Sequence, residues 1–199
     1  IAKSGICQDK NPQVRLAAFL ALSEMPSPSP TAAQVLAVAV SRSENSNDRW
    51  LRDALTSAAA VHDRYFLIAL ANASWIKSLV DLDDPAREVT RRVAEHFGRG
   101  APVDSIGEVL LANAKHPSSP VLEDTIAGLA AGWPKGKPAK LDEAAEKSLL
   151  DILSRLAPAQ RGTLVNLAAR LGSKALESHV AEIAKGFLSV ASDAQANES

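Results

Sequence analysis

Residues 9–25 of the chain read DKNPQVRLAAFLALSEM, a tight turn followed by an amphipathic helix. Asn11 precedes a proline and is therefore disfavoured in helical geometry, whereas Pro12 is tolerated at a helix start, where its missing N–H has no partner to lose. Apolar residues then recur at steps of three and four, which predicts a helix over residues 13–25 with one buried stripe. The stripe consists of Val14, Ala17, Ala18, Ala21, Leu22 and Met25. An ordinary capped surface helix is the alternative interpretation.

This opening resembles the second helix of a HEAT repeat. A turn aspartate, a proline, a valine and an arginine arrive in the same order, and an alanine-rich helix follows them. The resemblance implies that Asp9 hydrogen-bonds to backbone in the turn, that Val14 begins the buried face, and that Arg15 contacts a neighbouring repeat.

The composition favours an all-α protein without a strongly basic surface. The chain has 199 residues, of which 46% are hydrophobic and 4% aromatic, and it lacks the alternating runs of Val, Ile, Tyr and Thr that predict strands. Its net charge of −1 is unlike that of proteins held to nucleic acid by phosphate neutralisation. Cys7 is the only cysteine, which excludes an internal disulfide and a cysteine-based zinc site. Neither an apolar run of about 18 residues nor a signal peptide is visible.

The rest of the sequence predicts a succession of short helices. Proline, glycine and capping residues mark their ends, and apolar residues recur with helical spacing between those marks. The expected helices span residues 31–42, 49–61, 65–71, 75–80, 86–98, 104–115, 120–132, 142–156, 158–171 and 174–190. Residues 43–47 are expected to form a polar loop. The apolar faces are expected to carry Trp50 and His96 inward.

The helices recur with a period close to that of HEAT units. The apolar faces of the expected second helices begin at Val14, Trp50, Val89, Val121 and Leu164. These starting points lie 36, 39, 32 and 43 residues apart, and HEAT units run to about 40 residues. The pattern favours an all-α fold, an α-solenoid of about five HEAT-like helix pairs, over an irregular helical bundle.

Further predictions concern the two ends of the chain. Residues 1–8 resemble the end of a helix whose start is missing, and the first residue is Ile1 rather than methionine. We therefore expect a fragment of a longer protein. Residues 1–190 would form a single HEAT-like domain, and residues 191–199, which lack apolar periodicity, a disordered tail.

Two further parts of the sequence carry a closer resemblance. One is GLAAGWP at residues 128–134 with the leucines after it and the run 161–172, and the other is DRWLRDAL at residues 48–55. Together they resemble the HEAT region of large bacterial multidomain proteins that also carry a sugar-dehydrogenase-like β-propeller and a c-type cytochrome module. The resemblance spans about residues 9–190. It implies a spacer or docking platform between functional modules, and export to the periplasm or beyond. The haem-attaching Cys-x-x-Cys-His does not carry over, because Cys7 is followed by Gln8 and Asp9.

Two basic spots are the candidate partner-binding residues. The first is a face of the helix over residues 86–98, and the second is the loop after Trp133. They comprise Arg87, Arg91 and Arg92, and Lys135 and Lys137. Such a cluster could hold phosphate or an acidic partner. The alternative is a solvated helix face paired with Glu88 and Glu95.

For the remaining candidate residues, the sequence predicts structural roles. The histidines show no i, i+4 pair of the kind found in helical metal sites; they are His62, His96, His116 and His179. We expect His96 to be buried, His62–Asp63 to cap a helix, and Cys7 to be a buried or capping thiol. Asp81, Asp83 and Asp84 precede a helix and are expected to cap it rather than to bind a cation.

The three tryptophans allow two interpretations. We expect Trp50, Trp75 and Trp133 to fill gaps between stacked helices. The alternative is an exposed stacking platform for a base or a sugar.

Three functional hypotheses follow. The first is a non-catalytic protein-interaction or spacer scaffold that binds a protein or a neighbouring domain, with no cofactor and no metal. The second is a HEAT-like DNA glycosylase or another nucleic-acid-binding solenoid enzyme, which needs a concave basic face with aromatic residues. The third is a structural module of a multidomain oxidoreductase.

Overall fold

The computed structural model describes residues 4–73, 84–115 and 120–179. Within these ranges the chain is helical and contains no strand, as the composition and periodicity predict. The expected helix over residues 75–80, most of the one over 174–190, and the expected tail at 191–199 lie outside the described residues.

The described helices match the sequence prediction to within about two residues at each end. They are η1 (Ile6–Gln8), α1 (Pro12–Ser23), α2 (Pro30–Val40), α3 (Ser43–Ser46), α4 (Arg49–Val61), α5 (Asp63–Ala71), α6 (Asp84–Arg99), α7 (Ile106–Ala114), α8 (Pro120–Gly132), α9 (Glu143–Arg155), α10 (Pro158–Leu171) and η3 (Glu177–His179). Proline stands at the first helical position of α1, α2 and α10, where it costs no hydrogen bond.

Two segments differ from the prediction. Residues 43–47, expected as a loop, contain the single turn of α3, because the Asn45 side chain donates to the Ala39 carbonyl (2.9 Å) and ties this turn to the end of α2. Residues 174–179 form a turn and η3 rather than the start of a long α-helix. Gly172 adopts a left-handed conformation (φ 78°), and the Ser173 hydroxyl accepts a bond from the Ala175 N–H (3.2 Å), which favours a turn.

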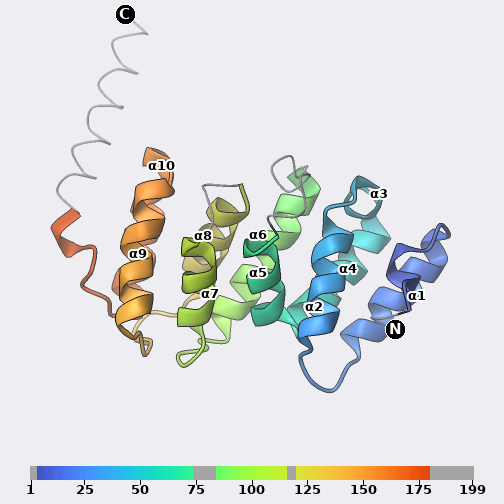
Figure 1. The fold of residues 1–199 in the computed structure, drawn as a ribbon, viewed down its shortest axis with the longest axis horizontal. Coiled ribbons are helices and arrows are strands. Elements are labelled where there is room, and N and C mark those ends of the chain that lie inside the picture. The colour runs from blue at the N-terminus through green and yellow to red at the C-terminus, as the bar shows by residue number, and fades with distance from the viewer. Residues whose placement is uncertain (1–3, 74–83, 116–119, 180–199) are drawn as a thin grey trace, which may run out of the picture.

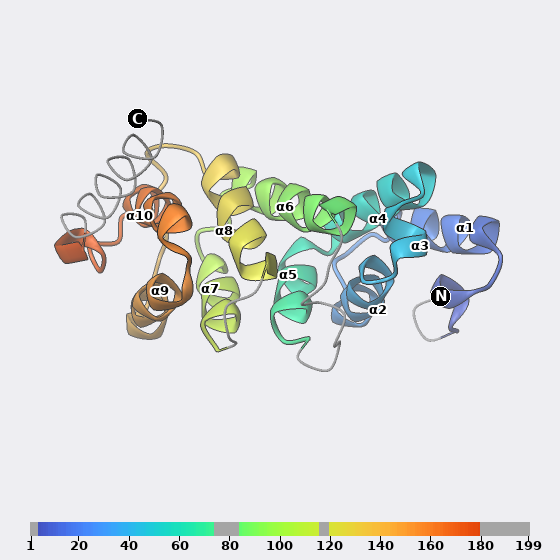
Figure 2. The ribbon, with the colours of Figure 1, turned by 90° about the horizontal axis from the view of Figure 1, so that it is seen from above.

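The helices lie in two rows (Figures 1 and 2). Row one consists of α1, α4, α6, α8 and α10, each packed on the next. Row two consists of α2, α5, α7 and α9, packed in the same manner. Row-one helices begin at Pro12, Arg49, Asp84, Pro120 and Pro158, so the spacing between successive starts is nearly constant. This period is more regular than the one inferred from the apolar faces.

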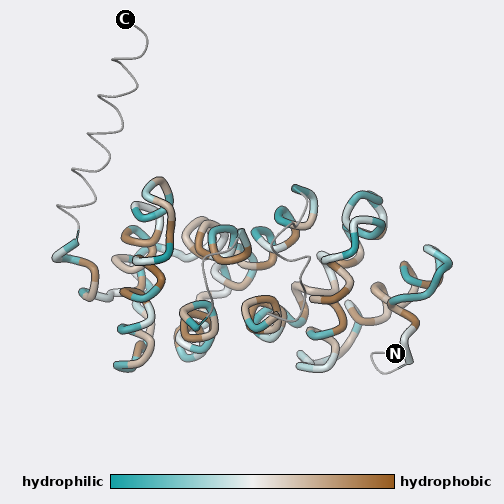
Figure 3. The backbone as a smooth tube through the Cα atoms, turned by 45° about the horizontal axis from the view of Figure 1, so that its top comes forward, coloured by the Kyte–Doolittle hydropathy of each residue, from teal (hydrophilic) through white to brown (hydrophobic). Residues whose placement is uncertain are grey.

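The core lies between the rows and along the contacts within each row. Leu36 and Phe66 of row two and Leu55 and Leu129 of row one are fully buried. Each helix therefore changes from hydrophilic to hydrophobic around its circumference, as the colouring of Figure 3 shows.

Helices α6 and α8 approach each other closely enough to require glycine. A Cβ atom on Gly132 would lie 2.1 Å from the Glu95 carbonyl oxygen, and one on Gly128 would lie 2.3 Å from the Arg91 carbonyl oxygen. Gly98 on α6 faces the Leu129 backbone in the same way, at 3.1 Å. Glycine at these positions lets two helix backbones come together where any side chain would collide.

The buried face of α1 is rotated relative to the predicted stripe. The structure buries Arg15, Ala18, Phe19 and Leu22, whereas Val14 is half-buried and Ala17 is exposed. Among the described helices of row one, α1 packs against α4 alone, so its buried face is the one that meets α4. The predicted stripe took no account of this one-sided packing.

Candidate functional site

The turn that opens α1 contains the backbone hydrogen bond that the resemblance implies for Asp9. The Asp9 carboxylate accepts a bond from the Asn11 N–H (2.8 Å), and the Asn11 side chain caps α1 by accepting from the Gln13 N–H (2.9 Å). Arg15, only 5% exposed, donates to the Asp9 carbonyl (2.7 Å) and reaches Asn45 of α3 (2.8 Å). Arg15 thus connects α1 to α3.

Arginine recurs at the same position of other row-one helices. Arg52 lies four residues after the N-cap of α4, as Arg15 does in α1, and donates to the Ser46 carbonyl (2.9 Å). Arg161 occupies this position in α10 and donates to the Leu156 carbonyl (3.2 Å). These arginines brace the preceding turn, which is a structural role.

Arg87, the first candidate partner-binding residue, links α6 to α8. Its Nε atom lies 2.8 Å from Oδ2 of Asp124, and its Nη2 atom lies 4.0 Å from a Glu123 carboxylate oxygen. The hydrogen bond to Asp124 raises the pKa of Arg87. Its charge is therefore compensated within the fold.

Arg91 and Arg92 share one carboxylate. Both contact Glu88, and the Arg92 Nε atom lies 2.7 Å from its Oε1 atom. Hydrogen bonds from the two guanidinium groups lower the pKa of Glu88. Arg99 pairs with Glu95 in the same manner. The geometry matches the alternative interpretation of this surface, a solvated face whose charges pair along the helix.

Lys135 and Lys137 are exposed on the loop between α8 and α9. The loop is anchored by Trp133, which is buried and donates its indole N–H to the Lys137 carbonyl (2.8 Å). Because Gly128 faces Arg91 and Gly132 faces Glu95, α6 and α8 run parallel. The lysine loop therefore lies beyond the opposite end of this helix pair from Arg87, and the two predicted basic spots do not form one site.

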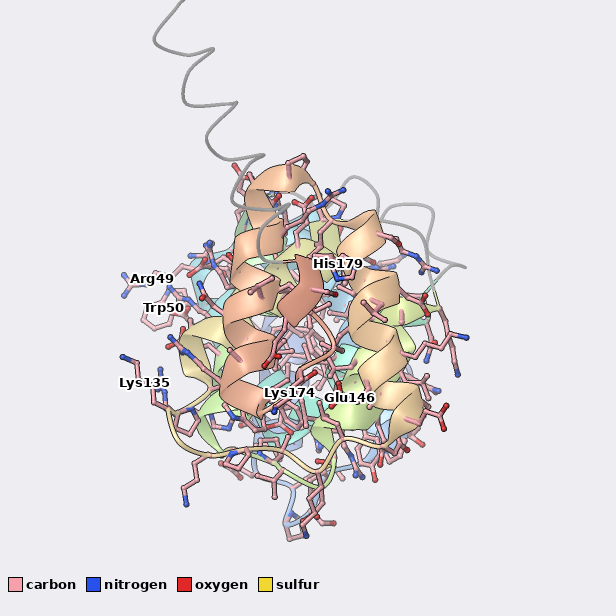
Figure 4. The ribbon with its side chains drawn as sticks, turned by 90° about the vertical axis from the view of Figure 1, so that its left-hand side faces the viewer. Arg49, Trp50, Lys135, Glu146, Lys174 and His179 are labelled. Carbon is pink, nitrogen blue, oxygen red and sulfur yellow. The ribbon has the colours of Figure 1, made fainter. Side chains whose placement is uncertain are left out.

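The tryptophans divide between the two interpretations. Trp133 is buried, as predicted, and Trp75 lies outside the described residues. The prediction for Trp50 is wrong, because this side chain is 69% exposed and points away from the body of the molecule (Figure 4). The buried face of α4 is formed instead by Leu51, Leu55 and the alanines of the helix, and Trp50 falls outside it. The Arg49 guanidinium lies 5.6 Å from the centre of the Trp50 ring and 3.8 Å from an Asp53 carboxylate oxygen.

The structure shows how far two of the histidines are buried. The prediction that His96 is buried is wrong: its side chain is 59% exposed, because Val93 and Phe97 take the covered face of α6. His62 is fully buried, and its Nδ1 atom accepts a bond from the Ser29 N–H (3.1 Å). Burial lowers the pKa of His62, an effect that the Leu22 carbonyl partly opposes.

Among the other predicted residues, Cys7 is buried as expected, and burial raises the pKa of its thiol. Asp84 is exposed in the first turn of α6, and His179 belongs to η3. Asp81, Asp83 and His116 lie outside the described residues.

The sequence did not predict two hollows in the surface. One, of about 500 Å³, lies between α2 and α5 and is lined by Val35, Val38 and Ile68 among others. The other, of about 380 Å³, is lined by Asp63, Arg64 and Tyr65 at the start of α5 and by residues of α6 and of the loop after it. Their walls come from segments that are far apart in the sequence, so no local spacing could have indicated them.

Comparison of the chain with protein-family models, with curated proteins and with solved structures finds no match. Across residues 4–73, 84–115 and 120–179, no three side chains of His, Cys, Asp or Glu gather closely enough to hold a metal ion. In the same ranges, every helix is too short or too polar to span a membrane.

Proposed function

We propose that this chain is a non-catalytic interaction scaffold, an α-solenoid of about five HEAT-like helix pairs that binds a protein or a neighbouring domain. The two rows of helices and the nearly constant spacing of the row-one helices support the solenoid. The recurrent arginine four residues after the N-cap supports a repeated unit, because Arg15, Arg52 and Arg161 each brace the turn before their own helix.

The protruding Arg49–Trp50 pair is the observation that carries the binding role. Tryptophan and arginine are the residues most enriched at the energetic centres of protein interfaces. Trp50 leaves 69% of its surface in contact with solvent, and covering an indole ring stabilises a complex strongly. Arg49 can remain stacked on the ring when a partner covers it. The partner we propose therefore has an apolar pocket for the indole ring.

The nucleic-acid hypothesis has weaker support. Arg87, Arg91 and Arg92 all contact carboxylates of α6 or α8, so they offer little uncompensated positive charge to phosphate. The hypothesis of a module in a multidomain oxidoreductase makes the same structural prediction as the scaffold and differs in the identity of the partner.

Site-specific photo-cross-linking tests the proposal. The photoreactive amino acid p-benzoylphenylalanine replaces Trp50 in one variant and Leu150 in a matched control. Leu150 is also an exposed apolar residue, 38% exposed, but it lies on α9 of row two. After irradiation in an extract of the cells that make the protein, we expect one dominant product from position 50 and no such product from position 150.

A binding measurement completes the test. The cross-linked partner is purified, and we expect Trp50→Ala to weaken its affinity for the chain by about tenfold or more, the loss of a single interface anchor. If the partner is a domain of the same polypeptide, the cross-link will be intramolecular. Equal products from both positions, or an affinity that Trp50→Ala leaves unchanged, would exclude this surface as the binding site.

A further inference from the structure

The cavity at the start of α5 combines a carboxylate with aromatic and apolar walls. The α1–α2 and α6–α7 loops, which contribute to its walls, lie at the lower edge of the molecule in Figure 1. Its residues come from these two loops, from the first turn of α5 and from the end of α6. A volume of about 380 Å³ lies within the range of small-molecule sites, which begins at about 300 Å³.

The Asp63 carboxylate lacks a close cationic partner. Its side chain is 24% exposed, and its Oδ1 atom accepts a bond from the Arg64 N–H (2.6 Å). Among the described residues, its ion pairing within 4.0 Å is limited to His96, whose Nε2 atom lies 4.0 Å from Oδ2 and is charged only when protonated. The cavity thus holds a largely buried carboxylate without a close Lys or Arg ion-pair partner among the described residues, and a bound cation would stabilise its charge.

The neighbouring Arg64 forms its ion pair with Glu108 rather than with this carboxylate, although its charge lowers the Asp63 pKa. Its guanidinium lies over the Tyr65 ring, 4.4 Å from the ring centre, and its Nη1 atom lies 3.5 Å from a Glu108 carboxylate oxygen. The charge of Arg64 is therefore directed towards Tyr65 and Glu108. Its position also shows that the face of Tyr65 can accept a cation.

The remaining walls suit an alkyl chain. Phe97 lines the cavity from α6, and Pro28 and Pro102 line it from the two loops. Such apolar surfaces cover the methylene stem of an amine while its charged head meets the carboxylate. Between Gly100 and Pro102, Ala101 adopts a left-handed conformation (φ 48°). This conformation is strained for a residue other than glycine, and strained backbone of this kind is concentrated at ligand sites.

We propose that this cavity binds a primary alkylammonium group, with the Asp63 carboxylate accepting hydrogen bonds from the ammonium and with Tyr65, Phe97 and the two prolines surrounding the alkyl stem. The group can belong to a lysine side chain of a protein or to a small free amine. The site is separate from Arg49–Trp50, and its test does not depend on the proposed scaffold function.

Nuclear magnetic resonance tests the site on the ¹⁵N-labelled chain. The probes are n-butylammonium chloride and Nα-acetyl-lysine methylamide, and the matched neutral probe is n-butanol at the same ionic strength. We expect both amines to shift the backbone amide signals of Arg64, Gly100 and Ser105 in a saturable manner, and we expect butanol to shift them little. Tighter binding of the lysine derivative would indicate a protein partner, and tighter binding of butylammonium a small amine; both results support the site.

Two variants sharpen the test. Asp63→Asn keeps the shape of the side chain but removes its charge, so the affinity for both amines should fall about tenfold or more, the value of one hydrogen bond to a charged group. Asp53→Asn, on the exposed face of α4, is the matched control and should leave the affinity unchanged. Equal shifts by butanol and butylammonium in the wild-type chain would overturn the proposal, and this comparison needs no variant to fold. Unchanged amine binding by Asp63→Asn would overturn it as well.

The dependence of binding on pH provides a second readout. The charged groups that act on Asp63 are His62 and Arg64 beside it and His96 from α6, with Glu108 of α7 facing Arg64. Acidification protonates Asp63 and so removes the negative charge that the ammonium group would meet. Burial raises the pKa of this carboxyl group above its ordinary value of 3.8, so we expect amine affinity to fall as the pH is lowered towards that raised pKa. Affinity that rises under these conditions would contradict the assigned carboxylate.

Discussion

Arg15 is a charged side chain that is almost completely buried. It is 5% exposed and donates to the Asn45 side chain and to the Asp9 carbonyl, at 2.8 and 2.7 Å. The sequence indicates this role through the resemblance of its turn to that of a HEAT repeat. The structure adds the partner Asn45, which belongs to a short helix in a segment that the sequence suggests is a loop.

Replacing Arg15 by alanine should lower the free energy of unfolding by about 1.5–3 kcal/mol, because the Asn45 oxygen and the Asp9 carbonyl would lose a charged donor. The control is Arg49→Ala, since Arg49 is 77% exposed and pairs with Asp53 at 3.8 Å. Its effect should remain below about 0.5 kcal/mol. Urea denaturation measures both values, and equal effects would show that Arg15 contributes no more than a surface residue.

His62 should make stability depend on pH. Burial lowers the pKa of His62 below its ordinary value of 6.5. Below pH 6.5 the unfolded chain therefore binds a proton that the folded chain does not, and the stability falls as the pH is lowered. Asp63 acts in the opposite sense at lower pH, because burial raises the pKa of its carboxyl group above 3.8 and the folded state takes up its proton first.

We expect the free energy of unfolding to decrease between about pH 7 and pH 5.5 in the wild-type chain. His62→Gln should reduce this slope while lowering the stability at pH 7 through loss of the Ser29 bond. Urea titrations at several pH values test this, and an unaltered slope in His62→Gln would assign it to other groups.

Among the helices, the α6–α8 pair is held at a distance that only glycine permits. Gly128 and Gly132 place the α8 backbone directly against the carbonyls of Arg91 and Glu95. The sequence shows these glycines one helical turn apart but does not show which helix they meet. That helix comes earlier in the chain, and α7 separates it from α8.

Gly132→Ala should lower the free energy of unfolding by about 1–3 kcal/mol, because its Cβ atom would lie 2.1 Å from the Glu95 carbonyl oxygen and the helices would have to separate. Gly107→Ala is the matched control, since Gly107 lies in α7 and its Cβ atom would meet only the Ala145 methyl group at 3.2 Å. This control should cost much less than Gly132→Ala, because the contact is with one methyl group rather than with backbone and because alanine favours helix. A Gly132→Ala variant as stable as wild type would mean that the two helices are farther apart.

The complete fold is an assembly of neighbouring helices, so stability should vary along it. In row one, α8 packs against both α6 and α10, whereas α1 packs against α4 alone. Beside Ile6, the other flank of α1 presents Val14, Ala17 and Ala21 in a shallow apolar groove. In repeat architectures each unit is stabilised mainly by its neighbours, so a helix with one row neighbour should open more readily.

Amide hydrogen exchange at low protein concentration tests this gradient. The buried amides of α1, such as those of Ala18 and Leu22, should exchange faster than those of Ile126 and Leu129 in α8. Equal protection in the two helices would mean that the chain unfolds as one unit. A protection of α1 that rises with protein concentration would show that a second copy covers its apolar groove.

The positions of α1, α2 and α4 to α10 along the chain could be inferred from local sequence alone. Their ends depend on prolines, caps and glycines that act within a few residues, and Leu55 and Leu129 fall on stripes set by helical periodicity. These are local effects, so they could be inferred without knowing what packs where. The ion pairs on the exposed face of α6 could also be inferred from the sequence, because Glu88 lies one turn from Arg91 and Arg92 on the same helix.

Which flank of each helix is covered, by contrast, depends on tertiary packing. Trp50 and His96 lie beside apolar stripes that predict them inside, yet both are exposed because their neighbours in the rows cover other faces of α4 and α6. His62 is enclosed at the turn between α4 and α5. The cavity around Asp63 joins the start of α5 to the end of α6, and Arg87 finds Asp124 on the next helix of its row. These contacts join segments that are distant in the sequence, and they depend on how the rows stack rather than on any local spacing.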